Sequence, residues 1–116
     1  MTTSTSNTSW TDICSVTDLT PNGGTCAQFN DQQVAIFLCK RTDSVYAIDN
    51  YDPLGEANVL SRGIIGSTAD ITYVASPLYK QRFNLATGEC LDSGVHQLKT
   101  FDIRIENDQV QLKEAS

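Results

Sequence analysis

Apolar and polar residues alternate along much of this chain in short runs, which is the pattern of β-strands with one buried face. The clearest run is "FDIRIENDQVQLK", in which Phe101, Ile103 and Ile105 share one face. A turn at Asn107–Asp108 follows, and the alternation then resumes in "VQL". A period of two that continues across a polar turn predicts a pair of antiparallel strands.

The same reading predicts about eight short strands in all. They lie at residues 10–14, 25–29, 33–39, 45–49, 70–76, 81–88, 101–106 and 109–113. Asn30–Asp31 is a hairpin signal between the second and third strands. A helical turn is expected only at 55–61. We therefore predict an all-β fold with little helix, an antiparallel β-sandwich or small barrel.

With 116 residues the chain has the length of one domain. Residues 1–9 are rich in Ser, Thr and Asn and are expected to form a disordered tail, which leaves 10–116 as the folded domain. The tail has neither the positive charge nor the apolar stretch of a leader peptide, so a cytoplasmic location is expected.

Charge and hydropathy exclude two classes of partner. The net charge of −6 argues against nucleic acid, because phosphate binding requires clustered Lys and Arg. The longest apolar run, "VAIFLC" at 34–39, is far shorter than the roughly 18 to 20 residues of a membrane span.

The four cysteines, Cys14, Cys26, Cys39 and Cys90, form no pair with the spacing of metal ligands. In a cytoplasmic protein they are expected to be reduced. Cys26 and Cys39 fall in predicted strands, where a thiol usually acts as a small buried apolar group. A redox or metal role is the alternative.

Signatures of catalysis are missing from the sequence. It contains no GxGxxG, P-loop, GxSxG or HExxH motif. His96, the single histidine, lies in a polar loop without a nucleophile nearby. Asp49, Asp52 and Glu56 surround Pro53, and turn formation explains them better than a cation site. No catalytic residue is predicted.

Two segments, "VYAIDNYDPLGEANVLSRG" at 45–63 and "VASPLYKQRFNLATGEC" at 74–90, resemble the two cluster-binding boxes of Rieske domains. In that family two thiolates and two imidazoles hold a [2Fe–2S] cluster. The resemblance places the first pair of ligands on Asp52 and Leu54 and the second pair on Ser76 and Tyr79. None of these four side chains is a thiolate or an imidazole, so no metal site and no cofactor of its own are expected in this chain.

The chain from about Trp10 to Lys113 also resembles the small-subunit family of the assimilatory NAD(P)H-dependent nitrite reductases. The residues that carry this resemblance include "VAIF", "VLSRG" and "VASPLYKQRF". It implies a Rieske-like fold and a partner, the large subunit, that holds FAD, an iron–sulfur cluster and sirohaem. That partner oxidises NAD(P)H and reduces nitrite to ammonium in nitrate assimilation, while the small subunit supports the activity without an active site.

Two hypotheses concern the box loops. In the first, Leu54 packs against Tyr79 and fills the space of the missing cluster. In the second, the loops form the interface with the large subunit through Arg62, Tyr79, Lys80 and Arg82; Arg82 could instead pair within the domain.

Two other functions stay open at this point. One is a Rieske-like interaction domain of another oxidoreductase. The other is a redox protein of the ferredoxin kind, which the missing ligands disfavour.

Overall fold

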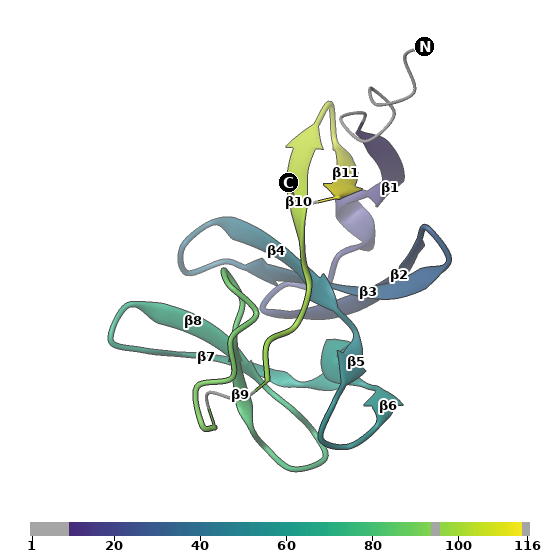
Figure 1. Ribbon diagram of the computed structural model, residues 1–116. Coiled ribbons are helices and arrows are strands. Elements are labelled where there is room, and N and C mark those ends of the chain that lie inside the picture. The colour runs from purple at the N-terminus through teal and green to yellow at the C-terminus, as the bar shows by residue number, and fades with distance from the viewer. Residues whose placement is uncertain (1–9, 94–95, 115–116) are drawn as a thin grey trace.

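The computed structural model describes residues 10–93 and 96–114. The predicted tail at 1–9 lies outside the described residues. The described residues form eleven strands and two short 3-10 helices (Figure 1). The predicted all-β class with little helix is confirmed.

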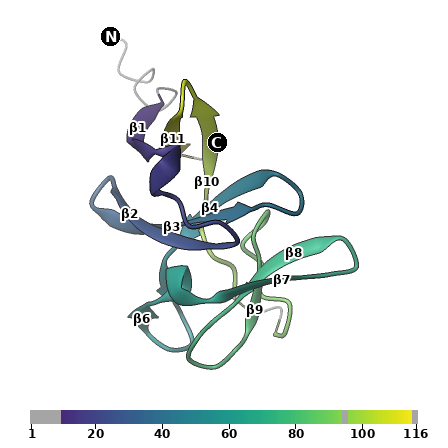
Figure 2. The ribbon, with the colours of Figure 1, turned by 180° about the vertical axis from the view of Figure 1, so that it is seen from behind.

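Six strands form one antiparallel sheet that curves into a nearly closed barrel (Figures 1 and 2). Their spatial order is β1-β11-β10-β4-β3-β2. Their bounds are β1 Thr11–Ser15, β2 Gly23–Phe29, β3 Gln32–Cys39, β4 Ser44–Asp49, β10 Thr100–Glu106 and β11 Gln109–Glu114.

The remaining strands form two smaller sheets below β3 and β4 in the view of Figure 1. One has the order β7-β8-β9, and the other pairs β5 with β6. The bounds are β5 Tyr51–Asp52, β6 Ala57–Asn58, β7 Ile64–Thr68, β8 Ile71–Ala75 and β9 Arg82–Asn84. The 3-10 helices are η2 Val16–Asp18 and η3 Leu60–Arg62.

The strand β3 is buried on both faces, which explains why its sequence is continuously apolar rather than alternating. Val34 and Ile36 belong to a core cluster inside the barrel. Ala35 and Phe37 point the other way, into a second cluster that they share with the β7-β8-β9 sheet, here called the small sheet. One strand therefore holds the two halves of the molecule together.

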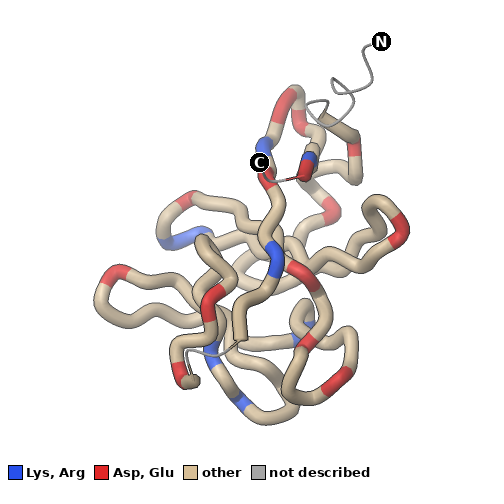
Figure 3. The backbone as a smooth tube through the Cα atoms, viewed as in Figure 1, with Lys and Arg blue, Asp and Glu red and all other residues tan. Residues whose placement is uncertain are grey.

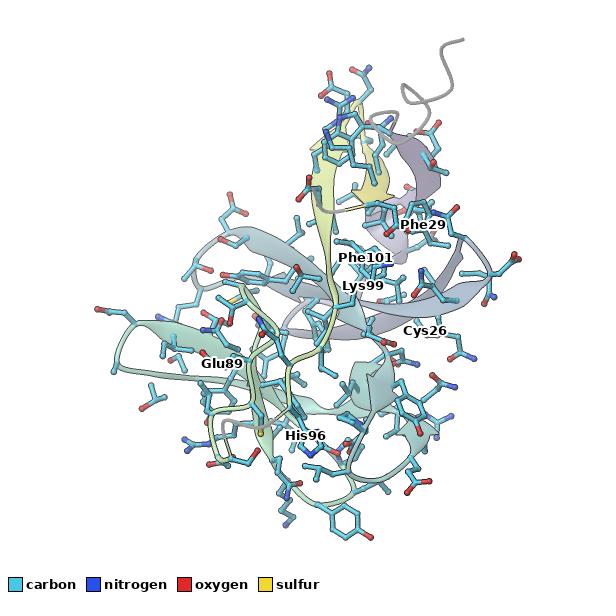
Figure 4. The ribbon with its side chains drawn as sticks, in the orientation of Figure 1. Cys26, Phe29, Glu89, His96, Lys99 and Phe101 are labelled. Carbon is cyan, nitrogen blue, oxygen red and sulfur yellow. The ribbon has the colours of Figure 1, made fainter. Side chains whose placement is uncertain are left out.

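The barrel cluster includes an aromatic pair. Phe29 and Phe101 meet edge to face, with ring centres 5.8 Å apart and planes at 80° (Figure 4). The Nζ atom of Lys99 lies 5.0 Å from the centre of the Phe101 ring. The Phe29–Phe101 contact joins β2 to β10, which lie three places apart in the sheet order.

Three strands were not predicted, and each lacks the alternating pattern. β5 and β6 have only two residues each. β7 contains Gly66 and begins with Ile64, which is 75% exposed, so only Ile65 contributes an apolar side chain to the core. The expected helical turn at 55–61 is wrong in place, because β6 occupies 57–58 and the 3-10 turn falls at 60–62.

Two-residue turns close three hairpins, and both predicted turns, Asn30–Asp31 and Asn107–Asp108, are confirmed. The third is Ala69–Asp70, between β7 and β8. All six turn residues have positive φ angles, between 47° and 69°. Such angles are typical of turns that match the twist of the strands, and Asn, Asp and Gly adopt them most readily.

Ala69 is the misfit among these turn residues, because its Cβ disfavours a φ of 47°. We expect Ala69→Asn to stabilise the fold by about 0.5–1 kcal/mol. In thermal unfolding this would raise Tm by roughly 2–6 °C. The matched control is Asn107→Ala, at the corresponding position of the β10–β11 turn, which should lower Tm by a similar amount. An unchanged or lower Tm for Ala69→Asn would contradict the argument.

Candidate functional site

The two box loops lie side by side at the bottom of Figure 1. The first loop, residues 52–56, connects β5 to β6, and the second, residues 76–81, connects β8 to β9. We call these two loops together the tip. The predicted ligand positions Asp52 and Leu54 lie in the first loop, and Ser76 and Tyr79 lie in the second.

Two polar side chains are buried at the base of the tip. Asp52 is 0% exposed and Ser76 is 1% exposed. The Ser76 hydroxyl donates a hydrogen bond to Asp52 Oδ2, which joins the two loops. Each side chain also accepts from an amide of its own loop: Leu54 N to Asp52 Oδ1 at 2.9 Å and Leu78 N to Ser76 Oγ at 3.2 Å.

The two loops have the same main-chain hydrogen bonding. In the first, Glu56 N donates to the carbonyl of Asp52 at 2.7 Å. In the second, Lys80 N donates to the carbonyl of Ser76 at 3.0 Å. Glu56 and Lys80 also share a positive φ, 54° and 65°. Both loops thus contain a five-residue turn, which begins at Asp52 or Ser76 and is closed by a main-chain hydrogen bond.

The loops also touch through apolar atoms. A Cβ placed on Gly55 would lie 2.3 Å from Leu78 Cδ1, so Leu78 lies directly against the first loop. The hypothesis of a buried contact between Leu54 and Tyr79 is wrong, because Tyr79 is 63% exposed. The polar pair at the base and the contact of Gly55 with Leu78 occupy the space between the loops instead.

The donor atoms at the tip do not suit a [2Fe–2S] cluster. The four positions carry a carboxylate, an alkyl group, an aliphatic hydroxyl and a phenol, whereas a Rieske cluster requires two thiolates and two imidazoles. Within residues 10–93 and 96–114, no three His, Cys, Asp or Glu side chains are placed to share a metal ion. The turn-forming role of the nearby carboxylates is confirmed, because Asp49 and Asp52 each accept from the amide two residues later.

The four cysteines are free thiols away from the tip loops. Cys39 is buried, as predicted, and a hydrogen bond from the Thr42 side chain lowers the pKa of its thiol. The prediction for Cys26 is wrong: it is exposed, because it lies on the outward face of the edge strand β2 (Figure 4). Burial raises the pKa of the Cys14 thiol. His96 is partly exposed, and its carbonyl accepts from Cys90 N at 3.0 Å.

The residues predicted for an interface divide into two groups. Arg62, Tyr79 and Lys80 are exposed on or beside the tip. Arg82 is committed within the domain: its Nη2 lies 2.8 Å from Asp92 Oδ1, and its guanidinium lies 5.5 Å from the centre of the Tyr73 ring. The alternative for Arg82, internal pairing, is therefore confirmed.

Sequence reasoning missed three residues that shape this end of the molecule. Leu78 and Ile64 are 47% and 75% exposed, and Ile64 pairs with Ala75, the residue before the second loop. Asn50 is buried and accepts from Ser61 N at 2.7 Å, which fixes η3 and hence Arg62. The position of Asn50 inside the first box, two residues before Asp52, was the available signal.

Comparisons with known proteins agree with this geometry. A family model described as a Rieske-like [2Fe-2S] domain matches residues 9–113. The nitrite reductase (NADH) small subunit of Escherichia coli (strain K12) is 44% identical over 104 residues, which are 90% of this chain and 96% of that protein. The NMR structure of the E. coli protein NirD superposes with a TM-score of 0.83 at 44% identity, covering 93% of this chain and 98% of that one.

A longer relative is also known. The nitrite reductase [NAD(P)H] large subunit of Klebsiella oxytoca is 39% identical over 101 residues, which are 87% of this chain but 10% of that protein. The fold and the paired tip loops define a Rieske-like domain with other residues at the four ligand positions. More narrowly, the chain belongs to the family of nitrite reductase small subunits.

The ion pair of Arg82 with Asp92 gives a pH-dependent prediction. Hydrogen bonds from Arg82 hold the pKa of Asp92 below its ordinary value. The stabilisation is therefore present above the pKa of an unfolded aspartate, about 4, and is lost as the pH falls through the lower folded pKa. We expect Asp92→Asn to unfold at a lower temperature than the parent at neutral pH.

The difference in Tm should shrink between about pH 5 and about pH 2, where the parent loses the charge on Asp92. Thermal unfolding followed by circular dichroism across this range measures it. A difference that stays constant with pH would show that the charge of Asp92 contributes nothing to stability. Glu114→Gln is a parallel case away from the tip. Lys99 and Asn30 lower the pKa of Glu114, so the difference in Tm between this variant and the parent should also shrink as the pH falls.

Proposed function

We propose that this chain is the non-catalytic small subunit of an NAD(P)H-dependent nitrite reductase. It associates with a large subunit that carries FAD, sirohaem and an iron–sulfur cluster and reduces nitrite to ammonium in nitrate assimilation. The observation that carries the proposal is the 44% identity to the E. coli small subunit over nearly the whole domain. The tip, with Asp52, Leu54, Ser76 and Tyr79, supports a role without a cluster in this chain.

The relative from Klebsiella oxytoca supports a direct association with the large subunit. That protein is named a large subunit, yet about a tenth of it resembles this domain. A domain fused to its partner is held at a high effective concentration beside it. As a separate chain, the same domain has no linker to the large subunit and therefore needs a surface that binds the large subunit directly.

A cytoplasmic location is part of the proposal. All four cysteines are free thiols, which suits a reducing compartment. No helix within the described ranges is long and apolar enough to cross a membrane.

The tip is the surface that we assign to this association. Five large apolar side chains are exposed among the described residues, and three of them, Ile64, Leu78 and Tyr79, lie on or beside the tip. Exposed apolar groups that gather in one place commonly mark an interface. Arg62 and Lys80 lie at the same end of a chain with a net charge of −6.

Figure 3 shows charges of both signs at the tip. The loop between β8 and β9 carries a blue segment, whereas the loop between β5 and β6 and the turns of the β2–β3, β7–β8 and β10–β11 hairpins carry red ones. Lys80 on the second loop and Arg62 beside it suit a partner with acidic groups next to an apolar centre, because opposite charges steer the approach and reject wrong orientations.

The first test is reconstitution. The large subunit from the same organism is assayed for NAD(P)H-dependent nitrite reduction alone and with this chain added in excess. We expect the two proteins to elute together in gel filtration and the activity to rise when both are present. Separate elution with unchanged activity would refute the proposed function.

The second test concerns the tip. The double variant Arg62→Glu/Lys80→Glu should weaken binding of the large subunit by roughly tenfold or more, because both charges are reversed at the surface. The matched control, Lys40→Glu/Arg41→Glu, makes the same change in net charge at the exposed β3–β4 turn and should bind normally. Equal affinities for the two variants, measured by titration calorimetry, would exclude the tip as the interface. Arg82 is left intact, since its substitution would also break the ion pair with Asp92.

A further inference from the structure

In a Rieske domain the iron–sulfur cluster joins the two box loops, because each loop supplies ligands to it. The side chains at the four corresponding positions of this chain do not fit such a cluster. We propose that the buried hydrogen bond from Ser76 to Asp52 replaces the cluster as the cross-link of the tip, so that this chain forms its tip without iron.

The first argument is position. Asp52 and Ser76 are the first residues of their loops, and the resemblance to Rieske boxes places the first ligand of each box on them. The Ser76 hydroxyl donates directly to the Asp52 carboxylate. The hydrogen bond therefore joins the same two points of the chain that a cluster would bridge.

The second argument is burial. The two side chains are 0% and 1% exposed, and a polar group so deeply buried is costly unless its hydrogen bonds are satisfied. Here both side chains have hydrogen-bond partners. Asp52 accepts from the Ser76 hydroxyl and from Leu54 N, while Ser76 also accepts from Leu78 N.

The third argument is the connection from the cross-link to the exposed surface. The side chains of Asp52 and Ser76 accept from the amides of Leu54 and Leu78. The main-chain carbonyls of Asp52 and Ser76 accept from the amides of Glu56 and Lys80. A change at the base of one loop should therefore loosen the other loop as well. A side chain that only stabilises its own turn would not have this effect.

This inference concerns the chain alone and does not depend on the proposed function. It is tested by amide hydrogen exchange of the purified full-length chain, which reports the opening of each loop separately. In Ser76→Ala the cross-link is lost while the first loop is untouched in sequence. We expect the amides of Leu54 and Glu56, in the first loop, to exchange at least tenfold faster than in the parent.

The matched control is Ser44→Ala. Ser44 Oγ donates to the carbonyl of Thr42 within one turn, at 3.1 Å, so its loss should speed exchange only around the β3–β4 turn. If Ser76→Ala speeds exchange only at 76–81 and leaves 52–56 at the parent rate, the cross-link does not exist.

Ser76→Cys provides a second variant should the alanine variant not fold. A thiol is a weaker donor than a hydroxyl, so exchange at Leu54 and Glu56 should still rise, though less than in Ser76→Ala. Parent rates at both amides in this variant would overturn the proposal.

The role of iron is tested on the parent chain itself. Protein produced in iron-depleted medium and purified with a chelator should match iron-replete protein in Tm and in the exchange rates of both loops. Faster exchange at 52–56 and 76–81 in the iron-depleted protein alone would show that a metal, and not the hydrogen bond, holds the tip together.

Discussion

The structure depends on the burial of one strand, β3, on both of its faces. Val34 and Ile36 pack inside the barrel, and Ala35 and Phe37 pack beneath the small sheet. All four are 0% exposed, and burial of such side chains contributes roughly 1.5–3 kcal/mol each for the larger ones. Because both cores share this strand, neither the barrel nor the small sheet can pack fully without the other. This shared packing also fixes where the tip loops emerge from the two smaller sheets.

Short series of hydrogen bonds and packing contacts connect β3 to the tip. Asn50 binds Gln33 of β3 through its main chain and its side chain, and it also holds η3 through Ser61. Phe83 of β9 and Val74 of β8 belong to the same cluster as Phe37. The second loop therefore connects strands that are packed against β3, and the first loop follows Asn50, which is hydrogen-bonded to β3. This arrangement brings the first residues of the two loops within hydrogen-bonding distance.

Sequence patterns predicted the parts of this fold that are governed by local chemistry. The hairpin of β10 and β11 follows from alternation and from Asn107–Asp108, both of which act over neighbouring residues. β7 was missed because Ile64 and Gly66 conceal its pattern, and Cys26 was misplaced because exposure on an edge strand depends on what covers it. The resemblance located the positions Asp52 and Ser76 but not the bond between them. That bond joins residues 24 apart in sequence, and it becomes visible only when both loops have been folded.

The identical hydrogen bonding of the two tip loops has a consequence for how such domains evolve. Each loop is specified by an acceptor on its first side chain and by amides two and four positions later, and these amides belong to the backbone. The two loops adopt this same turn with different acceptors at the first position, a carboxylate in one and a hydroxyl in the other. A Rieske-like domain can therefore hold its two tip loops together through oxygen atoms in place of cluster ligands. A scaffold of this kind separates the inheritance of a recognition surface from the inheritance of redox chemistry.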